Sequence, residues 1–104
     1  MRPVLLVDDD KNILTTLQIH LEDLGFSPFI AQTGNQGINM FKKVKPGIVL
    51  LDLKLPDMSG LDVLKEILAA EIPTYVVIIT AYATIDTAVQ AIKIGAFDYL
   101  PKPF

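Results

Sequence analysis

Acidic residues directly follow short apolar runs at two points of the chain. The acidic run Asp8–Asp10 follows Val4–Val7, and Asp52 follows Ile48–Leu51. A carboxylate can attack a phosphoryl group and form an aspartyl-phosphate. Neighbouring carboxylates repel one another unless a cation lies between them. These acids therefore indicate phosphoryl-transfer chemistry that uses a carboxylate nucleophile and a metal ion.

A hydroxyl follows a further apolar run, and a lysine follows a short segment that is interrupted by Asp98. Thr80 follows Tyr75–Ile79, and Lys102 lies just past Phe97–Leu100. A lysine neutralises phosphate charge while the nucleophile attacks in line. An oxygen-only ligand set favours Mg²⁺ over zinc or copper, and Mg²⁺ is usually held by one or two carboxylates together with waters and phosphate oxygens. The set therefore predicts a Mg²⁺-dependent site.

These side chains can meet only if the apolar runs are strands of one sheet. The expected strands are Val4–Val7, Phe26–Ala31, Ile48–Leu51, Tyr75–Ile79 and Phe97–Leu100. Apolar residues at helical spacing lie between them: Ile13, Leu17, Leu21 and Leu24; Ile38, Phe41 and Val44; Leu64, Ile67 and Leu68; Ile85, Ala88, Val89 and Ile92. This alternation predicts an α/β fold with a five-stranded parallel sheet.

The composition of each strand suggests its place in the sheet. The first, third and fourth strands are continuously apolar, as strands buried on both faces should be. Pro28 in the second strand and Asp98 in the fifth favour edge positions. The resulting order is 2-1-3-4-5, which binds ligands at the carboxyl ends of the first and third strands. The acids and Thr80 should converge there, with Lys102 in reach.

Each of these residues also has a purely structural interpretation. Asp10 is expected to be a helix N-cap rather than part of the site. Asp52 read alone is a strand-end acid, Thr80 a strand-end hydroxyl and Lys102 a surface charge. Read singly, the structural interpretation prevails for each residue. Their combination, at the ends of the appropriate strands, favours the chemical interpretation.

Four segments together carry a family resemblance: Leu6–Asp10, Leu51–Gly60, Thr80–Tyr82 and Gly95–Phe104. They resemble the receiver domains of two-component response regulators, over the whole chain, and most of all those of nitrogen-regulation-type (sigma-54-dependent) transcriptional activators. The resemblance implies a flavodoxin-like doubly wound fold in which residues 1–104 form one receiver domain. It also implies that the phosphoacceptor is Asp52, that Mg²⁺ is held by Asp8, Asp9, Asp52 and the backbone carbonyl of Lys54, and that Thr80 and Lys102 contact the phosphoryl group.

Three further positions acquire expected roles from the resemblance. Tyr99 matches the aromatic switch position and would turn inward once the phosphoryl group draws Thr80 towards it. Alternatively, Tyr99 is a half-buried aromatic residue of an edge strand. Lys54 and Tyr82 would flank the path of the hydrolytic water and set the lifetime of the acyl phosphate, although Lys54 can equally be read as a solvated lysine.

The resemblance also implies partners. A sensor histidine kinase would donate the phosphoryl group, and an output domain, covalently linked or separate, would regulate transcription. A second copy of the chain is a candidate partner. Net charge is −3, with no Lys/Arg cluster, which argues against direct nucleic-acid contact. No apolar run approaches the ~20 residues that a membrane span needs, and the N-terminus lacks a signal-peptide pattern, so a cytoplasmic protein is expected.

The chain departs from the family pattern at its C-terminus. Family members continue with a loop and a fifth helix, whereas this sequence ends at Phe104. We therefore expect a receiver truncated at its C-terminus, with an apolar patch exposed on the first and third strands.

Two other functions compete with the signalling switch. A Mg²⁺-dependent phosphohydrolase could use Asp52 as its nucleophile, but Lys54 stands where such enzymes commonly place a proton-donating aspartate. A phosphorylation-independent interaction module could share the fold, but it would not need the complete Asp/Thr/Lys set.

Overall fold

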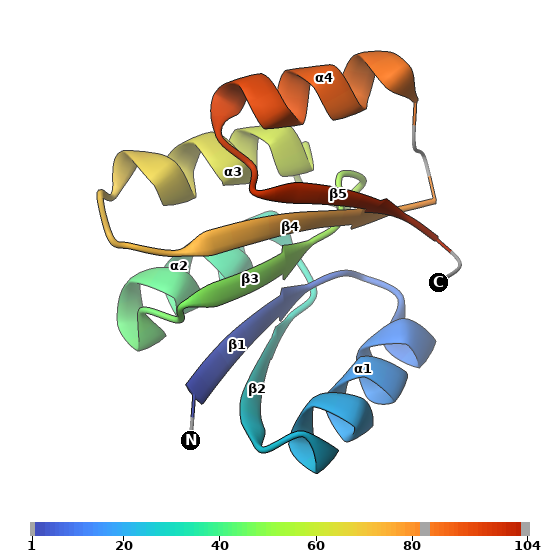
Figure 1. Cartoon of the computed structure of the whole chain (residues 1–104), viewed down its shortest axis with the longest axis vertical. Coiled ribbons are helices and arrows are strands. Elements are labelled where there is room, and N and C mark those ends of the chain that lie inside the picture. The colour runs from blue at the N-terminus through green and yellow to red at the C-terminus, as the bar shows by residue number, and fades with distance from the viewer. Residues whose placement is uncertain (1, 82–83, 103–104) are drawn as a thin grey trace.

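A single parallel sheet forms the centre of the molecule in the computed structural model, which describes residues 2–81 and 84–102. Its strands are β1 (Arg2–Val7), β2 (Phe26–Ala31), β3 (Ile48–Leu51), β4 (Tyr75–Thr80) and β5 (Asp98–Pro101). They pair in the order β2-β1-β3-β4-β5, and Figure 1 shows all five arrows running towards the same side. The predicted fold and strand order are confirmed, and β2 with its Pro28 lies at an edge.

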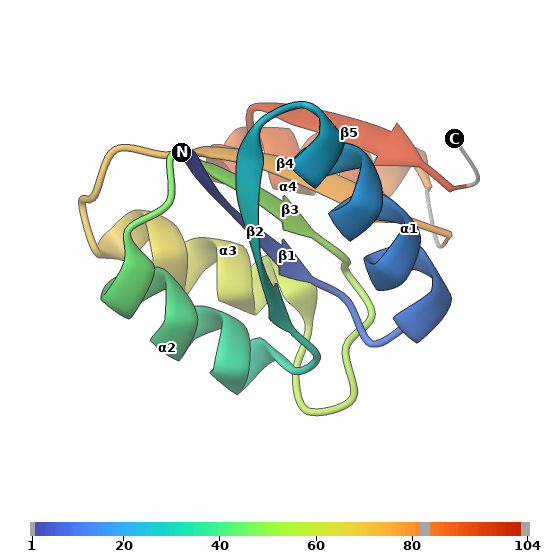
Figure 2. The same cartoon turned by 90° about the horizontal axis from the view of Figure 1, so that it is seen from below.

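Helices cover both faces of this sheet. They are α1 (Lys11–Asp23), α2 (Gly34–Val44), α3 (Gly60–Ala69) and α4 (Ile85–Ile94). Figures 1 and 2 show α1 on one face and α2 and α3 on the other. Successive strand residues point to opposite faces, so Leu5 and Val7 pack in the core under α2 and α3, whereas Val4 and Leu6 pack against α1.

Three of the four apolar residues that predicted α4 are exposed, and the fourth, Ala88, is half-buried. Ile85 is 84% exposed, Val89 is 45% exposed and Ile92 is 49% exposed, whereas the small Ala91 is fully buried. Leu24, expected in the apolar stripe of the first helix, lies just beyond the end of α1 and is 72% exposed. Helical spacing therefore located these helices correctly, but it did not show which side chains the sheet would cover.

The face of the sheet that carries α1 is only partly covered. Val4 and Leu6 of β1 are buried because α1 packs over them through Leu14. The uncovered part of the same face lies further along the sheet, where Val77 is half-buried and Leu100 is 43% exposed. The expectation of an exposed patch on the first and third strands was therefore wrong for the first strand, while Ile48 and Leu50 of the third strand are half-buried.

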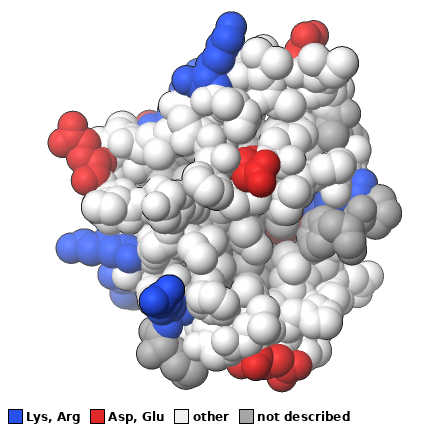
Figure 3. All heavy atoms as spheres, viewed as in Figure 1, with Lys and Arg blue, Asp and Glu red and all other residues white. Residues whose placement is uncertain are grey.

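Charged side chains do not gather on the face drawn in Figure 3. The basic and acidic groups of the described residues lie scattered across a largely uncharged surface. Within residues 2–81 and 84–102, no helix is both long and apolar enough to cross a membrane.

Candidate functional site

The carboxyl ends of the central strands hold the two buried acids through backbone hydrogen bonds. The Asp8 N–H donates to the carbonyl oxygen of Ala31 at 3.0 Å, and the Asp52 N–H donates to that of Val7 at 2.9 Å. The sheet hydrogen bonding thus continues one residue past β1 and β3. Because this bonding fixes the backbone of both acids, their carboxylates project from a rigid edge.

Lys102 reaches these carboxylates from the far end of the chain. Its Nζ donates to Asp8 Oδ2 at 2.6 Å and to Asp52 Oδ2 at 3.1 Å. Asp8 is 1% exposed, Asp52 is 4% exposed and Thr80, at the end of β4, is fully buried. The Lys102 N–H also donates to the Thr80 carbonyl oxygen at 2.9 Å, which extends the pairing of β4 and β5 and aims the lysine at the acids. The predicted convergence of Asp8, Asp52 and Lys102 occurs, and Thr80 lies at the end of the neighbouring strand.

Asp9 completes a cluster of three carboxylates. One carboxylate oxygen from each of Asp8, Asp9 and Asp52 lies within 4.8 Å of the others, with Asp9 on the exposed side. The ammonium of Lys102 pairs with two of these three acidic groups, Asp8 and Asp52. Oxygen-only ligands gathered within this distance fit a hard divalent cation.

The pKa values of Asp8 and Lys102 are both shifted by their burial and by their mutual contact. Burial raises the pKa of Asp8, and the hydrogen bonds from Lys102 and from the Asp10 N–H offset this only in part. For Lys102, burial acts to lower the pKa, but the hydrogen bonds to Asp8 and Asp52 outweigh it and leave the pKa above its ordinary value. The two carboxylates thus stabilise the ammonium of Lys102, whereas for Asp8 burial outweighs the stabilisation that it receives in return.

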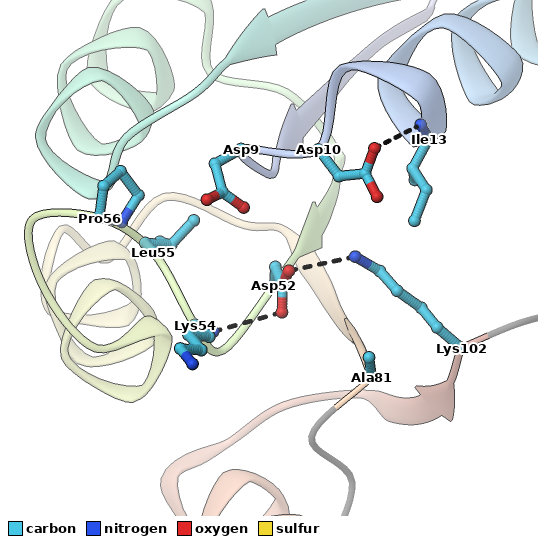
Figure 4. A pocket seen from close by; sticks show the side chains of 9 residues that line it. All are labelled: Asp9, Asp10, Ile13, Asp52, Lys54, Leu55, Pro56, Ala81 and Lys102. Carbon is cyan, nitrogen blue, oxygen red and sulfur yellow. Dashed lines mark hydrogen bonds and ion pairs between the residues drawn. The ribbon is translucent and has the colours of Figure 1, made fainter.

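A hollow of about 480 Å³ opens over the cluster. Figure 4 shows Asp9, Asp52 and Lys102 facing it from different elements, with Leu55 and Pro56 forming one wall. Asp10 turns to α1 instead, where its carboxylate accepts hydrogen bonds from the N–H groups of Asn12 at 3.0 Å and Ile13 at 3.3 Å. The N-cap role expected for Asp10 is thus confirmed.

The loop between β3 and α3 follows Asp52 in the sequence. The Lys54 N–H donates to Asp52 Oδ1 at 3.3 Å, and the Gly60 N–H donates to the Leu53 carbonyl oxygen at 2.7 Å. A Cβ atom on Gly60 would lie 2.5 Å from Leu53 Cα and would overlap the Asp52 carbonyl oxygen. The position therefore requires glycine so that α3 can start against the backbone of the acid.

Tyr99 lies half-buried on β5, on the side of the main core. Its hydroxyl is 3.0 Å from Thr87 Oγ1 of α4. Thr87 belongs to a capping box in which its hydroxyl accepts from the Thr84 N–H at 3.1 Å and Thr84 Oγ1 accepts from the Thr87 N–H at 3.1 Å. Sequence reasoning did not single out Thr87, although the Thr-x-x-Thr spacing ahead of the helix could have indicated the cap. Tyr82, expected near the site, lies outside the described residues.

Asp57 is a second residue that sequence reasoning missed. Its Oδ1 accepts from the Gly34 N–H at 2.7 Å and its Oδ2 from the Asn35 N–H at 2.9 Å, across 23 and 22 residues of sequence. These bonds tie the loop after β3 to the N-terminus of α2. No signal in the sequence joins an acid in this loop to the backbone of a helix so far away.

Comparison with known proteins gives a match over nearly the whole chain. The family model described as the response regulator receiver domain matches residues 4–104. The regulatory protein AtoC of Escherichia coli is 40% identical over 97% of this chain and 22% of its own length. The cell cycle transcriptional regulator CtrA of Caulobacter vibrioides is 40% identical over 97% of this chain and 44% of its own length. The chain thus spans less than half of either relative.

Solved structures share the fold closely. A signal receiver domain from Vibrio parahaemolyticus superposes with a TM-score of 0.94 at 42% identity, covering all of this chain and 81% of that one. A response regulator from Burkholderia pseudomallei, solved with a phosphorylated aspartic acid, a calcium ion and citrate, superposes with a TM-score of 0.94 at 31% identity. That match covers all of this chain and 61% of the other.

Proposed function

Because the chain belongs to the response regulator receiver domain family, we propose that it is a phosphorylation-dependent signalling switch that takes a phosphoryl group onto Asp52. The observation that carries the proposal is the position of this carboxylate. Asp52 lies at the base of the hollow, bonded to Lys102 and beside the carboxylates of Asp8 and Asp9. A nucleophile, an ammonium group and a cation-binding acid pair are the groups that in-line phosphoryl transfer requires.

The donor in this proposal is the phosphohistidine of a sensor histidine kinase. A carboxylate oxygen of Asp52 forms the new bond to phosphorus while the bond from phosphorus to the imidazole nitrogen breaks, and the electron pair stays on that nitrogen. Lys102, already within 3.1 Å of Asp52, offers its positive charge to the incoming oxygens. Thr80, buried on the neighbouring strand, is the proposed hydroxyl contact of the phosphoryl group.

Magnesium is the proposed cation. Asp8, Asp9, Asp52 and the backbone carbonyl of Lys54 would hold it, and the remaining coordination positions would go to water and phosphoryl oxygens, as is usual for Mg²⁺. When bound, it would neutralise the charge that develops on the transferring phosphoryl group. The oxygen-only donor set, with three carboxylate oxygens within 4.8 Å of one another, supports this assignment.

Tyr99 is the proposed switch. The phosphoryl group brings additional negative charge and acceptor oxygens, so the Thr80 hydroxyl is drawn to it and leaves space for an aromatic ring. Turning inward requires Tyr99 to release Thr87, and this release would pass the signal to the start of α4. Lys54, beside Asp52 in the loop, is the proposed determinant of the acyl-phosphate lifetime among the described residues; Tyr82 keeps this role as a prediction.

The wider context is proposed on the same basis. Residues 1–104 would form one receiver domain. Its signal would pass to an output domain that regulates transcription in the cytoplasm, with a second copy of the chain as a candidate partner. The chain's only catalysis would be of its own phosphorylation and dephosphorylation.

The test uses acetyl phosphate and beryllofluoride with the 104-residue chain. Intact-mass spectrometry should find one added phosphoryl group only when Mg²⁺ is present, and tyrosine fluorescence or NMR should respond to beryllofluoride with the same dependence. Asp52→Asn should abolish both responses. Asp23→Asn is the matched control, because it makes the same chemical change at an exposed site at the other end of α1. A wild-type chain that responds to neither reagent would refute the proposal, and sustained turnover of a phosphomonoester would favour the hydrolase instead.

A further inference from the structure

The loop of residues 53–59, between β3 and α3, is attached to a helix that contributes no residue to the hollow. Asp57 at the outer part of this loop accepts one hydrogen bond with each carboxylate oxygen, from the N–H groups of Gly34 and Asn35. These are among the first N–H groups of α2, which have no partner within the helix. The carboxylate is also favoured there because the N-terminus of a helix carries partial positive charge.

A close packing contact lies beside these hydrogen bonds. Met58 packs so tightly over the start of α2 that a Cβ atom on Gly34 would lie 2.6 Å from Met58 Sδ and 3.0 Å from Val63 Cγ2. A side chain larger than hydrogen at position 34 would therefore force the Met58 side chain to shift. The outer part of the loop is thus joined to α2 by two directional bonds and by close packing.

The inner part of the same loop forms one side of the phosphoacceptor pocket. Leu55 and Pro56 line the hollow opposite Lys102 (Figure 4). Lys54 follows Asp52 closely, bridges to Ser59, and makes a hydrogen bond to Asp52 Oδ1 that is long, at 3.3 Å. Leu53 and Leu55 on either side of Lys54 are buried in the main core, so the same short loop joins this wall of the hollow to the contacts with α2.

We propose that Asp57 is a positioning residue for the pocket: by tying the loop to α2, it holds the Lys54 carbonyl and the Leu55–Pro56 wall where the cation and the phosphoryl group bind. The inference rests on the proposed function of Asp52. It assigns to Asp57 a role in cation binding and phosphorylation although its carboxylate points away from the hollow, towards α2.

The chemistry of the contact explains why a carboxylate is needed. Two N–H donors face two acceptor oxygens, so asparagine would keep one acceptor and place an NH₂ group against the second donor. The hydrogen bonds from Asn35 and Gly34 lower the pKa of Asp57 below its ordinary value. The Asp57 carboxyl is therefore ionised at neutral pH.

The experiment compares Asp57→Ala and Asp57→Asn with wild type and with Thr33→Ala. Thr33 is the N-cap of the same helix, and its hydroxyl accepts from the Gln36 N–H at 3.1 Å without touching the loop. Thr33→Ala therefore weakens the start of α2 while leaving Asp57 in place. Each chain is titrated with Mg²⁺ by calorimetry and with acetyl phosphate at saturating Mg²⁺, at a temperature where circular dichroism shows it folded.

Asp57→Ala should weaken Mg²⁺ binding roughly 10-fold, the lower end of the range for loss of groups that support metal ligands, and raise the acetyl phosphate concentration needed for half-maximal rate. Asp57→Asn should lie between Asp57→Ala and wild type, and Thr33→Ala should stay within about twofold of wild type, as expected for a change that leaves the loop attached.

Wild-type affinity in Asp57→Ala, or an equal loss in Thr33→Ala, would overturn the positioning role while leaving the proposed function intact. A wild-type chain that binds no Mg²⁺ and takes no phosphoryl group would instead overturn the proposed function and this inference with it.

Discussion

The hydrogen bond between Tyr99 and Thr87 makes opposite predictions for stability and for activation. Tyr99→Phe removes the phenolic hydroxyl, keeps the ring in the core and leaves the Thr84–Thr87 capping box complete. The contact joins β5 to α4 at a partly buried position, with 3.0 Å between the two oxygens. If Tyr99 must release Thr87 to turn inward, the substitution should destabilise the resting fold and favour the activated one.

The magnitude follows from the type of bond. A neutral hydrogen bond contributes about 1 kcal/mol to stability, and for a domain of this size that lowers Tm by roughly 4–8 °C. Thr87→Val loses the same bond together with one side of the capping box, which adds about 1 kcal/mol. The double variant should therefore fall short of additivity by about 1 kcal/mol, which is the coupling energy of the pair.

The same substitution, Tyr99→Phe, should favour the activated state although it lowers the stability of the resting fold. A resting state weakened by about 1 kcal/mol shifts the equilibrium towards the activated state by about fivefold. Beryllofluoride with Mg²⁺ stabilises the activated state in this proposal, so Tyr99→Phe should bind it up to fivefold more tightly than wild type.

Chemical denaturation and a fluorescence or NMR titration test the two halves separately. Additive losses in the double variant would show that the two hydroxyls do not interact in solution. Unchanged or weaker beryllofluoride binding by Tyr99→Phe, together with the expected loss of stability, would refute the idea that this bond restrains the switch.

Three further predictions concern the acids and their surroundings. Asp8→Asn should stabilise the Mg²⁺-free chain at pH 7, because the raised pKa of Asp8 means that its ionised form is disfavoured in the folded state. This gain in stability should disappear as the pH falls below 3.8, the ordinary pKa of an aspartate, where the wild-type carboxyl is protonated in both states. Denaturation curves recorded across this pH range measure the effect. Lys102→Met leaves the clustered carboxylates without their ammonium, so calorimetry should find Mg²⁺ bound roughly 10-fold more tightly, equivalent to about 1.4 kcal/mol, while the phosphorylation rate falls. Gly60→Ala should cost about 2 kcal/mol of stability, because the added Cβ meets the backbone of Asp52 and Leu53; a wild-type Tm would contradict that account.

The parts of the site that lie at strand ends could be predicted from the sequence. Apolar runs gave the strands, and parallel strands place their carboxyl ends at one edge, so Asp8, Asp52 and Thr80 had to meet once the strand order was known. Lys102 followed for the same reason, since it lies directly after the last strand. The family expected from the four motifs was confirmed by the match to the receiver domain model.

Contacts made by loops and helix ends could not be predicted in the same way. The bonds of Asp57 run to backbone N–H groups, which every non-proline residue carries, so no choice of side chain at Gly34 or Asn35 signals them. The pairing of Thr87 with Tyr99 depends on where α4 lies relative to β5. Its exposed Ile85 shows that the helical pattern does not fix that placement.

The position of β5 at the sheet edge connects the chemistry to the switch. Within the described residues β5 pairs only with β4, and this one strand carries Tyr99 and is followed directly by Lys102. Phosphorylation would replace the carboxylate charge of Asp52 by a phosphoryl group that carries about 1.5 to 2 negative charges, in the place where Lys102 is now held by Asp8 and Asp52. If the phosphoryl group attracts Lys102, the movement of the lysine pulls on β5, which directly precedes it. Because β5 lies at the edge of the sheet, it can shift with little disturbance of the core. Lys102 and Tyr99 are therefore expected to respond to phosphorylation together, so that loss of the Lys102 charge should weaken the Tyr99 response even where Asp52 is still phosphorylated.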